Sequence, residues 1–143
     1  MIQYSDNTAT NMLVGNSATA ADLLVKYLDG LGVNLSQEEA QKNRITPAMM
    51  EVVWAKLYNE RDKYSKLIKY LEDSEAGEVI KDGIPNKKIA SKYGAIEDNY
   101  HETAIVFGDK DYMLLIYTNK LNNSKQAIRD IAKKIDEITN NNM

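Results

Sequence analysis

Three residues near the start of the chain, Ser5-Asp6-Asn7, place a hydroxyl and an amide side by side. They stand directly before a run, Thr8 to Val14, in which apolar residues recur at helical spacing. Asp6 or Asn7 suits the capping position, because a short polar side chain accepts hydrogen bonds from first-turn N–H groups. We therefore expect Ser5 and Asn7 on a stiff loop that leads into a helix, either as a cap alone or as polar groups of a site.

A second group of chemistry-bearing residues is Lys92-Tyr93-Gly94-Ala95. It lies on a stretch, Lys88 to Ala95, that alternates like a half-buried strand after the turn Gly83-Ile84-Pro85-Asn86. The chain's one histidine, His101, comes shortly afterwards. Since a lone histidine on a strand is more often structural than functional, His101 by itself does not predict a site.

The composition of the 143 residues, 43% hydrophobic and 27% charged, is typical of one globular domain. A net charge of −3 without a basic run argues against a nucleic-acid partner. With no cysteine and one histidine, we expect no disulfide, no metal site and no cofactor. No apolar stretch approaches the roughly 18 residues that span a bilayer. The opening Ile2-Gln3-Tyr4 does not indicate a signal peptide.

The elements that must position these groups change in type along the chain. Residues 1–80 read as mainly helical, with a polar connection from Leu35 to Arg44. The expected helices are Thr8 to Val14, one capped by Thr19 and closed by Gly30 and Gly32, one opened by Thr46-Pro47, and Tyr64 to Leu71. We expect Met49, Met50 and Trp54 to belong to the core rather than to a ligand site.

Residues 81–143 read as an antiparallel sheet followed by a helix. The expected strands are Lys88 to Ala95, Thr103 to Phe107 and Tyr112 to Thr118, the last two joined by the polar hairpin turn Gly108-Asp109-Lys110-Asp111. Met113 to Ile116 is apolar throughout, which predicts a strand covered on both faces.

The chain ends on an amphipathic helix in this prediction. Ser124 is its expected cap, and residues 140–143 are expected to fray. Its apolar stripe would be Ile128, Ile131, Ile135 and Ile138. The pattern predicts an α+β class for one domain, a helical subdomain followed by a three-strand antiparallel sheet with the C-terminal helix packed on it.

These motifs resemble the penicillin-recognising serine hydrolases, and most closely the class A β-lactamases. That family carries, in order, a Ser-x-x-Lys helix, a Ser-Asp-Asn loop and a strand reading Lys-Thr/Ser-Gly. The chain matches the second motif at Ser5-Asp6-Asn7 and the third at Lys92-Tyr93-Gly94, with one change at Tyr93. Thr46-Pro47-Ala48-Met49 also looks like the family. The resemblance covers nearly the whole chain and implies a partial β-lactamase/transpeptidase-like fold.

The resemblance implies catalytic roles for four residues. The family forms an acyl-enzyme on a serine nucleophile, which water then hydrolyses. Ser5 would relay a proton to the leaving nitrogen, and Asn7 would hold the acylating lysine and a substrate amide. Lys92 would supply positive potential near Ser5 and the substrate carboxylate. The backbone N–H of Ala95 would donate in the oxyanion hole.

Three further residues would contact substrate by the same resemblance. Gly94 would let substrate approach the strand closely. His101 falls where some members carry a second carboxylate-binding group. Tyr93 replaces the small hydroxyl residue that binds the carboxylate, and its bulkier phenol either turns away or narrows the site.

Two departures from the family bear on activity. Glu38 and Glu39 are the candidates for a deacylating base, but they lack the family's surrounding pattern. None of the chain's serines is followed three residues later by lysine. We therefore expect this chain to be the C-terminal part of a longer protein, inactive by itself. An alternative is a catalytically silent module that binds a peptidoglycan peptide or a protein partner.

The resemblance also implies partners and a location. The complete protein would be a bacterial, secreted or cell-envelope protein whose ligand is a β-lactam, as in antibiotic resistance, or a peptidoglycan peptide. We expect the Ser5 hydroxyl and the Lys92 ammonium to face one another across a cleft. Because the family's N-terminal strand and nucleophile helix are not encoded here, we expect self-association, or association with that N-terminal part.

Overall fold

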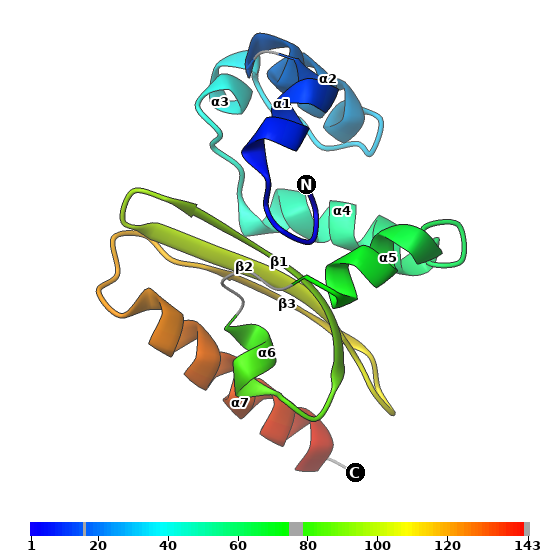
Figure 1. Ribbon diagram of the computed structural model, residues 1–143, viewed down its shortest axis with the longest axis vertical. Helices are drawn as coiled ribbons and strands as arrows, with labels where there is room; N and C mark the ends of the chain where they lie inside the picture. The colour runs from blue at the N-terminus through cyan, green and yellow to red at the C-terminus, as the bar shows by residue number, and fades with distance from the viewer. Residues whose placement is uncertain (16, 75–78, 142–143) are drawn as a thin grey trace. The chain divides into compact units, whose positions relative to one another are not determined.

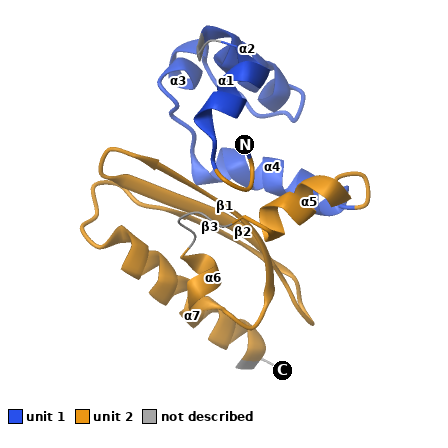
Figure 2. Cartoon of the chain, in the orientation of Figure 1, with its two compact units in different colours: residues 1, 5–61 blue, residues 2–4, 62–143 orange. Residues whose placement is uncertain are grey.

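The computed structural model describes residues 1–15, 17–74 and 79–141. The chain divides into two compact units (Figure 2). The helical unit comprises Met1 and Ser5–Arg61, and the sheet unit comprises Ile2–Tyr4 and Asp62–Met143. No helix among the described residues is long and apolar enough to cross a membrane.

The helical unit contains α1 (Asn7–Val14), α2 (Ser17–Asp29), α3 (Gln37–Gln41) and α4 (Pro47–Asn59) (Figure 1). Two predicted helix starts are confirmed by their cap bonds. The carboxylate of Asp6 accepts a 3.1 Å hydrogen bond from the Ala9 N–H. The Thr46 hydroxyl accepts one of 3.2 Å from the Met49 N–H, with Pro47 at the first helical position.

Two predictions in this unit are wrong. Thr19 is not a cap, because α2 already begins at Ser17 and the alanines around Thr19 favour helix. The stretch predicted as a polar connection contains α3, since Ser36 and Glu39 form a capping box. The Ser36 Oγ accepts from the Glu39 N–H at 3.2 Å and donates to the Glu39 carboxylate at 3.0 Å.

The core of the helical unit lies between α2, α3 and the start of α4. Its buried residues are Ala21, Leu28, Leu35 and Ala40, with Leu24, Val25, Val33, Met49 and Val53 packed against them. Trp54 is buried, whereas Met50 is half-buried. The predicted core role is thus confirmed for Trp54 and supported for Met49.

The sheet unit contains α5 (Ser65–Glu72), α6 (Ile80–Gly83), β1 (Lys88–Ile96), β2 (Asn99–Phe107), β3 (Tyr112–Tyr117) and α7 (Ser124–Asn141). The strands are antiparallel in the order β1-β2-β3. The predicted α+β class, with a three-strand antiparallel sheet and a C-terminal helix, is confirmed. α6 and the first four residues of β2 were not predicted.

One face of the sheet packs on α6 and α7, as Figure 1 shows. The core on this face consists of Val79, Ile80, Ile84, Ile89, Tyr100, Ala104, Val106, Leu114, Ile128 and Ala132. Lys87, which precedes β1, fastens α7 to the sheet through an ion pair of 3.0 Å to Asp136. The Tyr112 hydroxyl donates a 2.7 Å hydrogen bond to the same carboxylate. Burial alone would raise the pKa of Asp136, but these hydrogen bonds and the Lys87 charge outweigh it and lower that pKa.

Strand β3 is less covered than the sequence predicts. Only Leu114 is buried within it, while Met113, Leu115 and Ile116 are half-buried. The expectation that both faces are covered is thus met only in part, since no residue of β3 is exposed but only one is buried. The physical reason lies in where the helices go: α5 contacts β1, at the opposite edge of the sheet.

The last helix also differs from its prediction. Ser124 is its first residue rather than its cap, and Asn123, with φ of 64°, precedes it. Ile128 is fully buried, but Ile131, Ile135 and Ile138 are 45%, 37% and 46% exposed. The buried line runs instead from Ile128 to Ala132. The helix extends through residue 141, beyond the predicted start of fraying, and residues 142–143 lie outside the described part of the chain.

Candidate functional site

Ser5 stands in an uncommon backbone conformation just before α1. Its φ of 48° lies in the left-handed region, which costs a non-glycine residue on the order of 1–3 kcal/mol and occurs mostly at functional sites and tight turns. Asp6, the next residue, is tied to α1 by its cap bond, and Asn7 is the first residue of the helix. The predicted helix entry is confirmed for Ser5, which is half-buried and precedes the cap, whereas Asn7 already belongs to the helix and is exposed.

Lys92 and Gly94 lie on β1, which forms one edge of the sheet. In the register, Lys92 pairs with Thr103 and Gly94 pairs with His101. Because residues two apart on a strand share a face, these four residues lie on one face of the β1–β2 pair. A Cβ added at Gly94 would meet no described atom within 4 Å, so the face is open at this point.

The Tyr93 side chain packs on the core side of the sheet and not on the open face. Its ring stacks on Tyr100, with the centroids 5.6 Å apart and the planes at 12°. It also packs against the core that β1 shares with α6 and α7. Ala95, which the register pairs with Tyr100, is exposed.

His101 is held from two sides. Its Nδ1 accepts a 3.1 Å hydrogen bond from the Thr118 N–H, and its ring stacks on Tyr117 at a centroid distance of 4.4 Å. Burial lowers the pKa of His101, and burial raises the pKa of the Tyr117 phenol. A neutral imidazole whose Nδ1 accepts a hydrogen bond carries its proton on Nε2.

The sheet unit therefore places Lys92, Gly94, Ala95 and His101 in the half of the β1–β2 pair that runs from its middle to the turn after Ile96. Ser5 belongs to the helical unit, so the expectation that Ser5 and Lys92 face one another stays a prediction.

The two candidates for a deacylating base lie in α3. Glu38 forms an ion pair with Lys42, and Glu39 completes the capping box with Ser36. Both carboxylates thus make contacts that belong to a short exposed helix.

One buried carboxylate is not predicted from the sequence. Glu102 is fully buried, and its carboxylate accepts hydrogen bonds from the Val79 N–H at 2.9 Å and the Ile80 N–H at 3.2 Å. Its signal in the sequence is a charged residue directly before the apolar run of β2. The bonds attach β2 to the start of α6.

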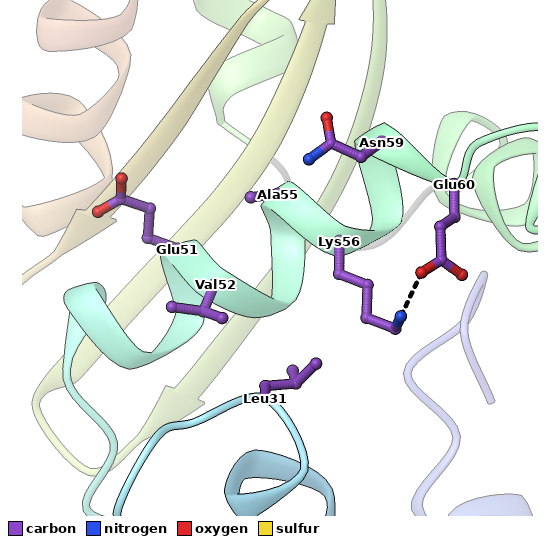
Figure 3. A pocket seen from close by; sticks show the side chains of 7 residues that line it. All are labelled: Leu31, Glu51, Val52, Ala55, Lys56, Asn59 and Glu60. Atoms are coloured by element: carbon purple, nitrogen blue, oxygen red, sulfur yellow. Dashed lines mark hydrogen bonds and ion pairs between the residues drawn. The ribbon is translucent and has the colours of Figure 1, made fainter.

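A cavity of about 550 Å³ lies in the helical unit (Figure 3). It is lined by Leu31, Glu51, Val52, Ala55, Lys56, Asn59 and Glu60. Lys56 and Glu60, which both line it, form an ion pair, as Figure 3 shows. None of the predicted site residues lines this cavity.

A known protein family matches nearly the whole chain. The model of a family described as the beta-lactamase enzyme family matches residues 1–139. No curated protein and no solved structure shows a significant match.

Proposed function

Because the chain belongs to the β-lactamase enzyme family, we propose that it carries the Ser-Asp-Asn and Lys-x-Gly side of a serine acyl-transfer site. The substrate would be a β-lactam or a peptidoglycan peptide, and the intermediate a serine acyl-enzyme. The observation that carries this proposal is the placement of Lys92 and Gly94 on an edge strand, on a face that is open at Gly94 and has His101 across from it.

In this proposal each matched residue has one task. Ser5, held in its left-handed conformation, passes a proton to the leaving nitrogen, and Asn7 holds the acylating lysine and a substrate amide. Lys92 provides positive potential for the substrate carboxylate, and the Ala95 N–H donates to the carbonyl oxygen as negative charge develops on it. His101 would add a neutral Nε2–H donor beside the carboxylate.

The nucleophile would come from a segment outside the given sequence, because none of the chain's serines is followed three residues later by lysine. For the complete protein we propose an extracytoplasmic location, as is usual for the family.

The test compares the chain alone with the chain combined with a segment that bears Ser-x-x-Lys. The chain alone should neither hydrolyse a chromogenic β-lactam nor form a penicillin adduct detectable by mass spectrometry. The combined protein should form the adduct, and Ser5→Ala or Lys92→Ala should abolish it, whereas Lys63→Ala, an exposed lysine of the sheet unit, should not. A penicillin adduct on Ser5 in the chain alone would contradict the proposed role of Ser5.

A second candidate function is a silent binding module that uses the same surface. The packing of Tyr93 onto Tyr100 favours it, because this leaves no small hydroxyl at the family's carboxylate-binding position. The contacts of Glu38 and Glu39 within α3 also favour it, because they occupy both candidate deacylating carboxylates. If the combined protein binds a peptidoglycan peptide but never forms the adduct, the module is the better description.

A further inference from the structure

The Lys92 ammonium rests on the ring of the next residue along β1. Its Nζ lies 4.5 Å from the centroid of the Tyr93 ring and donates a 3.1 Å hydrogen bond to the Tyr93 carbonyl oxygen. A cation within about 6 Å of an aromatic centroid is attracted by the negative face of the ring. Tyr93 therefore holds the ammonium by two groups, the ring and the carbonyl.

The Tyr93 ring is itself anchored. It stacks on Tyr100, which is 5% exposed and belongs to the core of the sheet unit. The Tyr100 backbone is fixed in turn by Thr118, whose hydroxyl donates to the Tyr100 carbonyl at 2.7 Å and accepts from the Tyr100 N–H at 3.2 Å. A ring supported in this way cannot swing aside without disturbing the core.

We infer that Tyr93 is a positioning residue for Lys92: its ring, anchored on Tyr100, fixes the ammonium at the edge of the sheet. The inference rests on the proposed function, in which Lys92 meets the carboxylate of an anionic ligand. The requirement at position 93 is then for an aromatic ring and not for a hydroxyl. Phenylalanine should hold the ammonium as tyrosine does, whereas an aliphatic residue should leave it with the hydrogen bond to the backbone carbonyl alone and hold it less firmly.

The test is nuclear magnetic resonance of the full 143-residue chain, because ring currents displace the signals of methylene protons that lie over an aromatic ring. The Lys92 ε-methylene signals should be displaced in the unmodified chain and in Tyr93→Phe, and the displacement should be lost in Tyr93→Leu. Tyr64→Leu is the matched control, since the Lys63 Nζ lies 4.9 Å over the Tyr64 ring. That variant should affect Lys63 and leave Lys92 unchanged.

The outcomes separate this inference from the proposed function. Undisplaced Lys92 signals in the unmodified chain, or displacement that persists in Tyr93→Leu, would overturn the positioning role. If Tyr93→Leu does not fold, Overhauser contacts between the Lys92 ε-methylene and the Tyr93 ring decide it: their presence supports the role and their absence overturns it. Titration with benzylpenicillin of the chain combined with the Ser-x-x-Lys segment tests the function separately. If the displacement of the Lys92 signals depends on the residue at position 93 but no variant binds penicillin, the positioning role holds and the proposed function fails.

Discussion

Gly94 and His101 lie directly opposite one another in the β1–β2 register. The glycine leaves its face of the sheet open, while the imidazole across from it is fixed by the Thr118 N–H and by Tyr117. A ligand could therefore approach the strand at Gly94 and accept a hydrogen bond from the fixed imidazole of His101. The glycine there is not required by the backbone, because its φ is not positive.

Alanine substitution at two glycines should distinguish a glycine that the packing requires from one that it does not. At Gly83 an added Cβ would lie 2.7 Å from the Arg129 carbonyl oxygen, so α6 must move away from α7. We expect Gly83→Ala to lower the free energy of unfolding by about 1–3 kcal/mol. Gly94→Ala should change it by less than about 0.5 kcal/mol. Urea unfolding followed by circular dichroism measures both, and equal losses would contradict this account of Gly94.

Glu102 should be important for the stability of the sheet unit. Glu102→Leu keeps a side chain of similar size but leaves the Val79 and Ile80 N–H groups without their acceptor. Each stranded buried N–H costs about 1–3 kcal/mol, so we expect a large loss of unfolding free energy. Glu102→Gln, which retains one acceptor oxygen, should lose less. Glu97→Gln, in the exposed hairpin turn, is the control and should be nearly neutral.

The titration of His101 should appear in the pH dependence of stability. Burial lowers its pKa below the ordinary value of 6.5, so the unfolded chain binds the proton more readily than the folded chain. Stability contributed by neutral His101 is therefore complete above pH 6.5 and declines as the pH falls through the lowered pKa. Because the chain has one histidine, nuclear magnetic resonance can follow this titration directly. In His101→Gln the decline just below pH 6.5 should be smaller, and an unchanged decline would exclude His101 as its source.

The features that the sequence predicts well are those with local signals. Asp6 and Thr46 cap their helices by accepting a hydrogen bond from the N–H group three residues later, and Pro47 follows Thr46 at the first helical position. Such signals lie close together in the sequence. α6 has no such signal, because the acceptor for its first N–H groups is Glu102, which lies 22 and 23 residues later in the sequence. The isoleucine spacing predicts a helix at the end of the chain correctly. It misjudges the buried face, since the choice of Ala132 over Ile131 depends on what packs against it.

In the candidate site, too, the features with local signals are predicted and those that depend on distant contacts are not. The alternating pattern predicts correctly that Lys92 and Gly94 lie on one strand. The pairing of Gly94 with His101 depends on the register between two strands, which the sequence alone does not determine. The sequence alone leaves two orientations open for the Tyr93 side chain. The structure has its ring on Tyr100, because a large aromatic side chain gains more from the core than from the open face.

The facing of Ser5 and Lys92 can be tested by cross-linking. The chain has no cysteine, so Ser5→Cys combined with Lys92→Cys gives one reactive pair without background. We expect a short thiol cross-linker to join this pair rapidly within one chain, because the proposed proton relay needs the two groups near each other. Ser5→Cys combined with Lys133→Cys, at an exposed position of α7, is the control and should react slowly. Equal rates for the two pairs would count against a shared site.

The free edge of β3 leads to the last prediction. Among the described residues β3 pairs with β2 alone, and its sequence from Tyr112 to Tyr117 contains no charged residue or proline that would discourage further pairing. Natural proteins avoid such an edge because it offers a template to other chains. On α7 the exposed side chains of Ile131, Ile135 and Ile138 recur at helical spacing and so add an apolar stripe to the surface of the sheet unit.

We therefore expect this chain not to persist as a free monomer in dilute solution. The β3 edge should pair with a second copy or with the N-terminal part of the same protein, and either pairing would satisfy its outer N–H and C=O groups. Sedimentation analysis over a range of concentrations measures this directly. Leu115→Lys, which puts a charge on the half-buried edge strand, should shift the distribution toward monomer, whereas Lys110→Glu in the adjacent turn should not. A monodisperse 16.2 kDa species that melts cooperatively would show that the edge needs no partner.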